Sequence, residues 1–140
     1  MSLAACSRAV QSEPPGPVQT ESVTGSYLVK VAKGQEVLAT IAAAAAGLGI
    51  TDGAITLIGA VHEVRISVMR KNDALTDLIR DYAQPFELTG TGELAGGQIH
   101  VHATLAGEDL TVAGHLHAAT VRDFFVHAYL SPLEIYPRET

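Results

Sequence analysis

Hydrophobic and polar residues alternate along most of the chain after residue 25, which is the pattern of half-buried β-strands. Strands are predicted at 27–31, 54–58, 61–69, 98–105, 110–118 and 121–130, with short strands and turns between 86 and 97. A bend or bulge is expected at Gly59, because a glycine inside a strand pattern marks such a site. The chain is therefore predicted to be rich in β-structure.

One segment departs from this alternation. Between residues 35 and 47 the apolar residues recur at helical spacing, and Gly47 and Gly49 close the segment, which predicts one amphipathic helix. Residues 72–80 are short and polar, and they are predicted as a helical turn or a lid-like connection. One main helix, short helices and many strands joined by turns indicate an α+β fold with a mostly antiparallel sheet.

Composition indicates one domain with two tails. A chain of 140 residues with 47% hydrophobic residues can bury the core of a single domain. Residues 1–24 are rich in proline and polar residues, so a flexible N-terminal tail is predicted there. The domain is placed at 25–132, and a C-terminal tail at 133–140, where prolines end the strand pattern.

Charge and cysteine content narrow the function classes. The formal net charge is −6, which disfavours binding to DNA or to an anionic membrane through overall charge. No apolar run approaches the roughly 18 residues of a membrane span. Cys6 is the only cysteine, and only two residues precede the small-residue stretch around it, so an exposed thiol is favoured over a lipidated one. A cytoplasmic location is expected.

Four of the six histidines fall in one predicted β-hairpin, as His100, His102, His115 and His117. Each pair is two residues apart on its strand, so its members share a face. A two- or four-residue turn centred between Gly107 and Glu108 places Leu105 opposite Leu110 and His100 opposite His115, with all four rings on one side. An odd-numbered turn would put the two pairs on opposite faces.

Three clustered imidazoles are a sufficient protein ligand set for a catalytic zinc ion. We therefore interpret His100, His102 and His115 as ligands of a divalent metal, with zinc favoured. A proton-transfer pocket without metal and an inert histidine-lined face are the alternatives. His62 and His127 are far away in the sequence and are disfavoured as ligands.

Proton carriers can be sought among the remaining polar residues. Glu87 alternates with Phe86 and Leu88, so it is either a solvated strand residue or a pocket carboxylate that acts as acid or base. His117 and His127 are the other candidates for such a catalytic role. A covalent nucleophile is not indicated, because no Gly-x-Ser-x-Gly elbow is present.

The order and spacing of several segments resemble the plant and prokaryote conserved (PPC) domain over residues 26–130. The matching segments are 33–38, 49–55, 58–61, 86–88, 100–105 and 114–116. The family's His-x-His-Ala strand corresponds to His100 and His102, and its Gly-Gly-His-Leu strand corresponds to residues 113–116, with Ala113 in place of the first glycine. The AT-hook of plant members has no counterpart in this sequence.

The resemblance implies an antiparallel sheet flanked by helices, a homotrimer of the stand-alone prokaryotic type, and a histidine site that can hold a metal. The hypothesis is a trimer with a zinc site in an interface pocket that binds or transforms a small polar molecule. If the protein is an enzyme, a metal-dependent lyase or hydrolase is expected, acting by hydrolysis, hydration or elimination. The alternative is a regulatory or scaffold protein that binds other proteins or associates with DNA.

Overall fold

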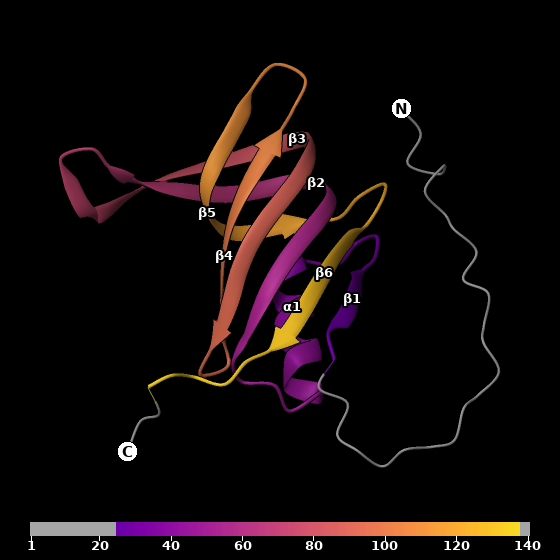
Figure 1. The fold of residues 1–140 in the computed structure, drawn as a ribbon. Coiled ribbons are helices and arrows are strands. Elements are labelled where there is room, and N and C mark those ends of the chain that lie inside the picture. The colour runs from indigo at the N-terminus through magenta and orange to yellow at the C-terminus, as the bar shows by residue number, and fades with distance from the viewer. Residues whose placement is uncertain (1–24, 138–140) are drawn as a thin grey trace, which may run out of the picture.

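A six-stranded antiparallel sheet and one helix make up residues 25–137, the part of the chain that the computed structural model describes (Figure 1). In chain order the elements are β1 (Tyr27–Val31), α1 (Val37–Gly47), β2 (Gly53–Arg70), β3 (Asp73–Ala95), β4 (Gln98–Ala106), β5 (Thr111–Thr120) and β6 (Val126–Pro132). The predicted antiparallel sheet with a main helix is confirmed. The additional short helices were wrongly predicted, since α1 is the only helix between residues 25 and 137.

The sheet curves until part of it closes. Its strand order is β1-β6-β2-β3-β4-β5, and β2 pairs with β5 as well. The strands from β2 to β5 therefore form a ring, in which every strand is hydrogen-bonded to two others of the ring. The first half of β2 pairs with β6 and the second half with β5, so one long strand joins the ring to the β1–β6 pair.

Strand β2 is continuous where the sequence predicted two strands. At Gly59 the strand passes very close to the segment before β6, since a Cβ on this glycine would lie 2.1 Å from the carbonyl oxygen of Phe125. The irregularity in pairing with β3 comes later, between Val61 and Glu63. Pro85 of β3 lies at this bulge, where a residue without an N–H group is tolerated.

Residues 73–80 form the start of β3 and Asn72 lies in the turn before it, so the prediction of a helical turn or lid over 72–80 was wrong. They pair with the end of β2 across a turn at Lys71 and Asn72, and residues 68–79 form an arm that projects from the body of the molecule (Figure 1). The arm exposes both of its faces to solvent over most of its length, so its side chains lack the one-sided hydrophobic pattern that identifies a strand. Backbone pairing with β2 determines its structure.

Helix α1 covers the inner face of the sheet. It begins after Glu36, whose carboxylate accepts hydrogen bonds from the backbone N–H groups of Leu38 and Ala39. Its buried residues, Val37, Ile41 and Ala45, are spaced by four and lie on one side of the helix. The helix contacts β1, β4 and β5, so its packing fixes the hairpin that carries most of the histidines.

Strand β6 begins later than predicted. Residues 121–125 form an irregular connection, and Val121 in this segment is buried and accepts a hydrogen bond from the backbone N–H of Gly34. Val121 thus bonds to the turn before α1, and at the other end of the segment Phe125 accepts a hydrogen bond from the backbone N–H of Ala60 in β2. Residues 133–137 contain no helix or strand, and the predicted N-terminal tail with Cys6 and residues 138–140 lie outside the described part of the chain.

No helix within residues 25–137 has the length and apolar character needed to cross a membrane. The only helix there, α1, has 11 residues.

Candidate metal centre

The β4–β5 hairpin brings the predicted histidines together, although its register differs from the predicted one. Leu105 pairs with Val112 and His102 pairs with His115, whereas the sequence pattern predicts Leu105 opposite Leu110 and His100 opposite His115. The four-residue turn is 107–110, closed by a 2.8 Å backbone hydrogen bond from Gly107 to Leu110. The shift is two residues, so every side chain keeps its predicted face.

His100, His102 and His115 form a compact cluster on the outer face of the sheet. The ring of His100 lies 4.8 Å, centroid to centroid, from each of the other two, and one ring nitrogen from each residue lies within 4.8 Å of the others. The inner face of the same strands carries core residues such as Val101 and Leu116, which hold the backbone in place. The cluster therefore stands on a rigid support while its rings face outward.

The donor set fits a divalent metal. Imidazole nitrogens bind zinc at about 2.0–2.1 Å, so nitrogens that share a tetrahedral ion are about 3.3 Å apart. The nitrogens of the cluster lie up to 4.8 Å apart, and rotation of the imidazole rings about their side-chain bonds can bring them closer together. His100 and His102 are exposed and His115 is half-buried, so three protein ligands leave room for a coordination position that faces solvent.

A fourth histidine lies beside the cluster. The ring centroid of His117 is 4.6 Å from that of His115, and its Nε2 is hydrogen-bonded to the hydroxyl of Ser67 at 2.7 Å. Ser67 is 3% exposed and belongs to β2, which pairs with β5 at this point. His117 is the extra residue of a β-bulge. Ile66 of β2 pairs with Leu116, and the neighbouring Arg65 pairs with Ala118, so His117 between them has no paired residue on β2. The bulge keeps His117 near the cluster.

The surroundings of His115 favour its neutral form. Partial burial lowers the pKa of His115, and repulsion from His117, His100 and His102 lowers it further, while the carboxylate of Asp77 acts in the opposite direction. A metal binds the neutral imidazole, so a lowered pKa keeps this ligand ready to bind at neutral pH.

Two carboxylates near the cluster were missed by the sequence reasoning. Glu93 of β3 pairs with His100, and together with His102 these residues line a cleft of about 300 Å³. Asp77 lies on the arm, close enough to act on the charge of His115. Glu93 and His100 pair across the tight Gly96-Gly97 turn, which is a hairpin signal that the sequence contains. Asp77 is brought to His115 only because β2 pairs with both β3 and β5, and local sequence spacing contains no signal for that contact.

The other predicted site residues lie elsewhere. Glu87 is exposed and lines a different cleft, which also contains His62. Strand β6 carries His127, whose ring stacks on Phe125 with centroids 4.2 Å apart, and β6 pairs with β1 and β2 rather than with β4 or β5. Of the three predicted proton carriers, the structure brings only His117 into ring contact with the cluster.

The burial of His127 gives a testable dependence of stability on pH. Burial and the nearby charge of Lys30 lower the pKa of His127 in the folded state. As the pH falls below about 6.5, the unfolded chain therefore takes up a proton at this residue before the folded chain does, and stability is lost. We expect urea unfolding to show that His127→Gln loses less stability than the unsubstituted protein between about pH 7.5 and pH 5.5. Equal losses in both proteins would contradict the assignment.

The fold and the cluster together define a small α+β protein with a potential histidine metal site. A family model for the Plants and Prokaryotes Conserved (PCC) domain matches residues 18–133. The chain belongs to this family, which confirms the resemblance found in the sequence. No curated protein matches the chain.

Solved structures share the fold at low sequence identity. A metal-containing protein from Archaeoglobus fulgidus superposes with a TM-score of 0.69 at 22% identity, covering 85% of this chain and 86% of its own. A plant- and prokaryote-conserved protein from Pyrococcus horikoshii gives a TM-score of 0.68 at 24% identity with the same coverage. A putative DNA-binding protein from Bacteroides thetaiotaomicron gives 0.66 at 22% identity, covering 85% of this chain and 84% of its own.

Proposed function

We propose that this protein is a homotrimer that holds a divalent metal, with zinc favoured, through His100, His102 and His115, and that it binds or transforms a small polar molecule there. The observation that carries the proposal is that one imidazole nitrogen from each of these residues lies within 4.8 Å of the others, although the residues belong to two different strands, β4 and β5. The metal-containing relative from Archaeoglobus fulgidus supports it. The cleft of about 300 Å³ beside His100 and His102 offers space for a small ligand.

The chemistry follows from the surrounding groups. A bound divalent ion would act as a Lewis acid and lower the pKa of a coordinated water. Glu93 can accept or orient a polar hydrogen of the ligand from across the strand pair. His117 can exchange a proton with a group bound at the cluster, because its ring contacts His115 and its Nε2 is held by Ser67. Hydrolysis, hydration and elimination are the reactions that such a set supports.

The proposed trimer would cover the exposed apolar residues of the arm. Met69 is 65% exposed and Leu75 is 97% exposed, and Val68 and Ile79 are exposed apolar residues on the two faces of the same arm. Clustered exposed apolar side chains are a common mark of protein interfaces. The arm projects from the body, so it can reach a second copy of the chain while Asp77 remains near the histidine cluster (Figure 1).

A regulatory role in association with DNA is the second candidate, because relatives from Bacteroides thetaiotaomicron and Ralstonia eutropha are described as putative DNA-binding proteins. The projecting arm and its base carry balanced charge over residues 63–81, with four basic residues against four acidic ones. These are Arg65, Arg70, Lys71 and Arg80, and Glu63, Asp73, Asp77 and Asp81. DNA binding that weakens steeply with salt would favour this candidate.

The test is metal analysis of untagged protein purified without added metal or chelator, with the mass in solution measured on the same sample. We expect about one zinc or similar ion per chain and the mass of a trimer. Treatment with a chelator should lower the melting temperature, because a ligand that binds only the folded state stabilises it. A metal-free protein that also resists reconstitution would contradict the metal proposal, and a monomeric mass would contradict the trimer.

A further inference from the structure

A second cleft lies away from the histidine cluster. It measures about 650 Å³ and opens where the pairing of β2 and β3 is irregular, so that His62 and Gln84 line it. Apolar residues line its floor, among them Val61, Pro85 and the almost fully buried Phe86, and the turn of the β4–β5 hairpin forms one side. Charged residues surround this apolar floor.

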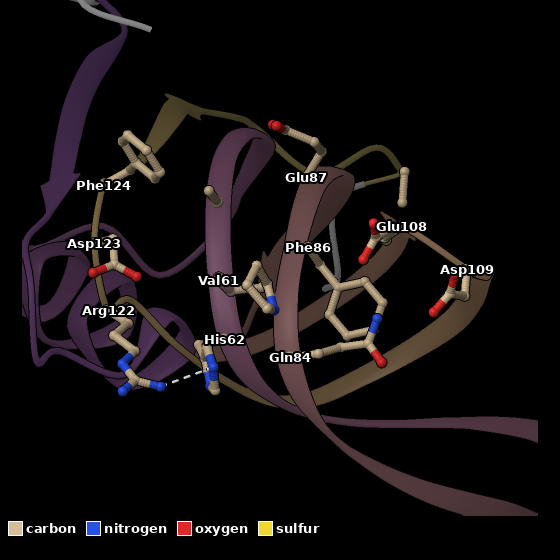
Figure 2. Close-up of a pocket in the computed structure, with 14 residues that line it drawn as sticks. Val61, His62, Gln84, Phe86, Glu87, Glu108, Asp109, Arg122, Asp123 and Phe124 are labelled. Atoms are coloured by element: carbon tan, nitrogen blue, oxygen red, sulfur yellow. Dashed lines mark hydrogen bonds between the residues drawn. The ribbon is translucent and has the colours of Figure 1, made fainter. Parts of the chain in front are cut away.

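On one side of the cleft the positively charged side chain is Arg122, and its hydrogen-bond partner is a histidine rather than a carboxylate. Arg122 donates a hydrogen bond from Nη1 to Nε2 of His62 at 2.8 Å (Figure 2). The other ring nitrogen of His62, Nδ1, then carries the hydrogen and donates to the carboxylate of Glu63 at 3.2 Å. This chain of hydrogen bonds orients the guanidinium, and within residues 25–137 no carboxylate lies within ion-pair distance of it. Its charge is available to an anionic group.

The other side of the cleft is acidic. Glu108 and Asp109 lie in the hairpin turn, across the cleft from Arg122 and His62, and Asp123 lies beside Arg122 (Figure 2). Glu87 adds a further carboxylate at the rim. A ligand that binds both sides must carry an anionic group at one end and a cationic group at the other, with an apolar stem along the apolar lining between them.

We propose that this cleft binds a small zwitterion of the basic amino acid class. Its carboxylate would bind Arg122, because guanidinium and carboxylate form a paired, charge-assisted hydrogen bond. Its side-chain ammonium would bind Glu108 and Asp109. The excess of carboxylates over cations in the cleft favours a ligand with two amines over one with a single amine. This binding is independent of the proposed metal centre.

The probe is L-lysine, titrated into the full-length protein and followed by calorimetry. A ligand of this size with partly exposed charge contacts is expected to bind with a dissociation constant of about 1 mM. The comparison ligand is 1,5-diaminopentane, which has the same stem and ammonium groups without the carboxylate. It is expected to bind about tenfold more weakly than lysine.

Substitutions test separately how the carboxylate end and the ammonium end of the ligand are bound. Arg122→Gln should weaken lysine about tenfold and leave 1,5-diaminopentane unchanged, and Glu108→Gln should weaken both ligands. Arg70→Gln on the arm makes the same change in net charge outside the cleft, so it should leave lysine binding unchanged. Glu108→Gln keeps the test decisive if Arg122→Gln does not fold.

Chelator treatment and His102→Ala should leave lysine binding intact, which keeps this test separate from that of the metal site. The proposal is overturned if lysine shows no saturable binding up to about 50 mM, well above the affinity expected for such contacts. It is also overturned if 1,5-diaminopentane binds as tightly as lysine, if Arg70→Gln weakens lysine as much as Arg122→Gln does, or if binding disappears with the metal.

Discussion

His102→Ala is expected to lower the affinity for a divalent metal by at least about 100-fold, since removal of a group that merely supports a ligand already costs 10–100-fold. His102 pairs directly with His115, and the nitrogens of both belong to the set that lies within 4.8 Å. His115→Ala should have an effect of the same size. The measurement is metal content after dialysis, together with competition against a chromogenic chelator.

The matched control for this prediction is His62→Ala. This histidine lines the separate cleft and is bonded to Arg122 and Glu63, so its removal should leave metal content unchanged. The melting temperature of each variant should be recorded without metal, to separate loss of a ligand from loss of the fold. Equal metal content in all three variants would show that the histidine cluster is not the site.

Gly114→Ala is expected to destabilise the protein by about 1–3 kcal/mol, which is typical of overpacking in a closely packed region. A Cβ at this position would lie 2.2 Å from the carbonyl oxygen of Ser67 and 3.0 Å from Cγ1 of Val68. Both atoms belong to β2, so β5 would have to move away from β2 to accommodate the added methyl group. Because His115 follows this glycine directly and pairs with Ser67, metal affinity should fall as well.

Gly47→Ala provides the comparison. Nothing lies within 4 Å of a Cβ added at Gly47, the last residue of α1. Alanine has the higher helix propensity and a smaller unfolded-state entropy, so the free energy of unfolding should rise by about 0.5 kcal/mol. Urea unfolding of both variants checks the pair. If Gly114→Ala were as stable as Gly47→Ala, the close approach of β5 to β2 would be incorrect.

Ala113 shows why a local motif is an incomplete guide to such contacts. It replaces the first glycine of the family's Gly-Gly-His-Leu strand, and a side chain there would hinder a tight approach of the backbone to a neighbouring strand. In the structure Ala113 is exposed and pairs with Thr104, whereas the close approach is made by Gly114. The substitution therefore leaves the packing of β5 on β2 unaffected.

The sequence alone determined those features that repeat with the period of a strand or a helix. Alternation along 98–105 and 110–118 predicted the β4–β5 hairpin, with each histidine pair on one face of its strand. The sequence left an even-numbered or odd-numbered turn open, and the structure decides for a four-residue turn. Helical spacing identified α1, whose buried residues follow that spacing. These predictions succeeded because burial of one face leaves a periodic trace in the sequence.

Only the tertiary structure decided which distant strands meet. The pairing of β2 with β5 brings Ser67 to His117, which is 50 residues further along the chain. The arm was missed because residues 72–80 are exposed on both faces, so backbone hydrogen bonds to β2 hold them without a hydrophobic pattern. Such contacts depend on sheet register and closure, and neither leaves a local mark in the chain.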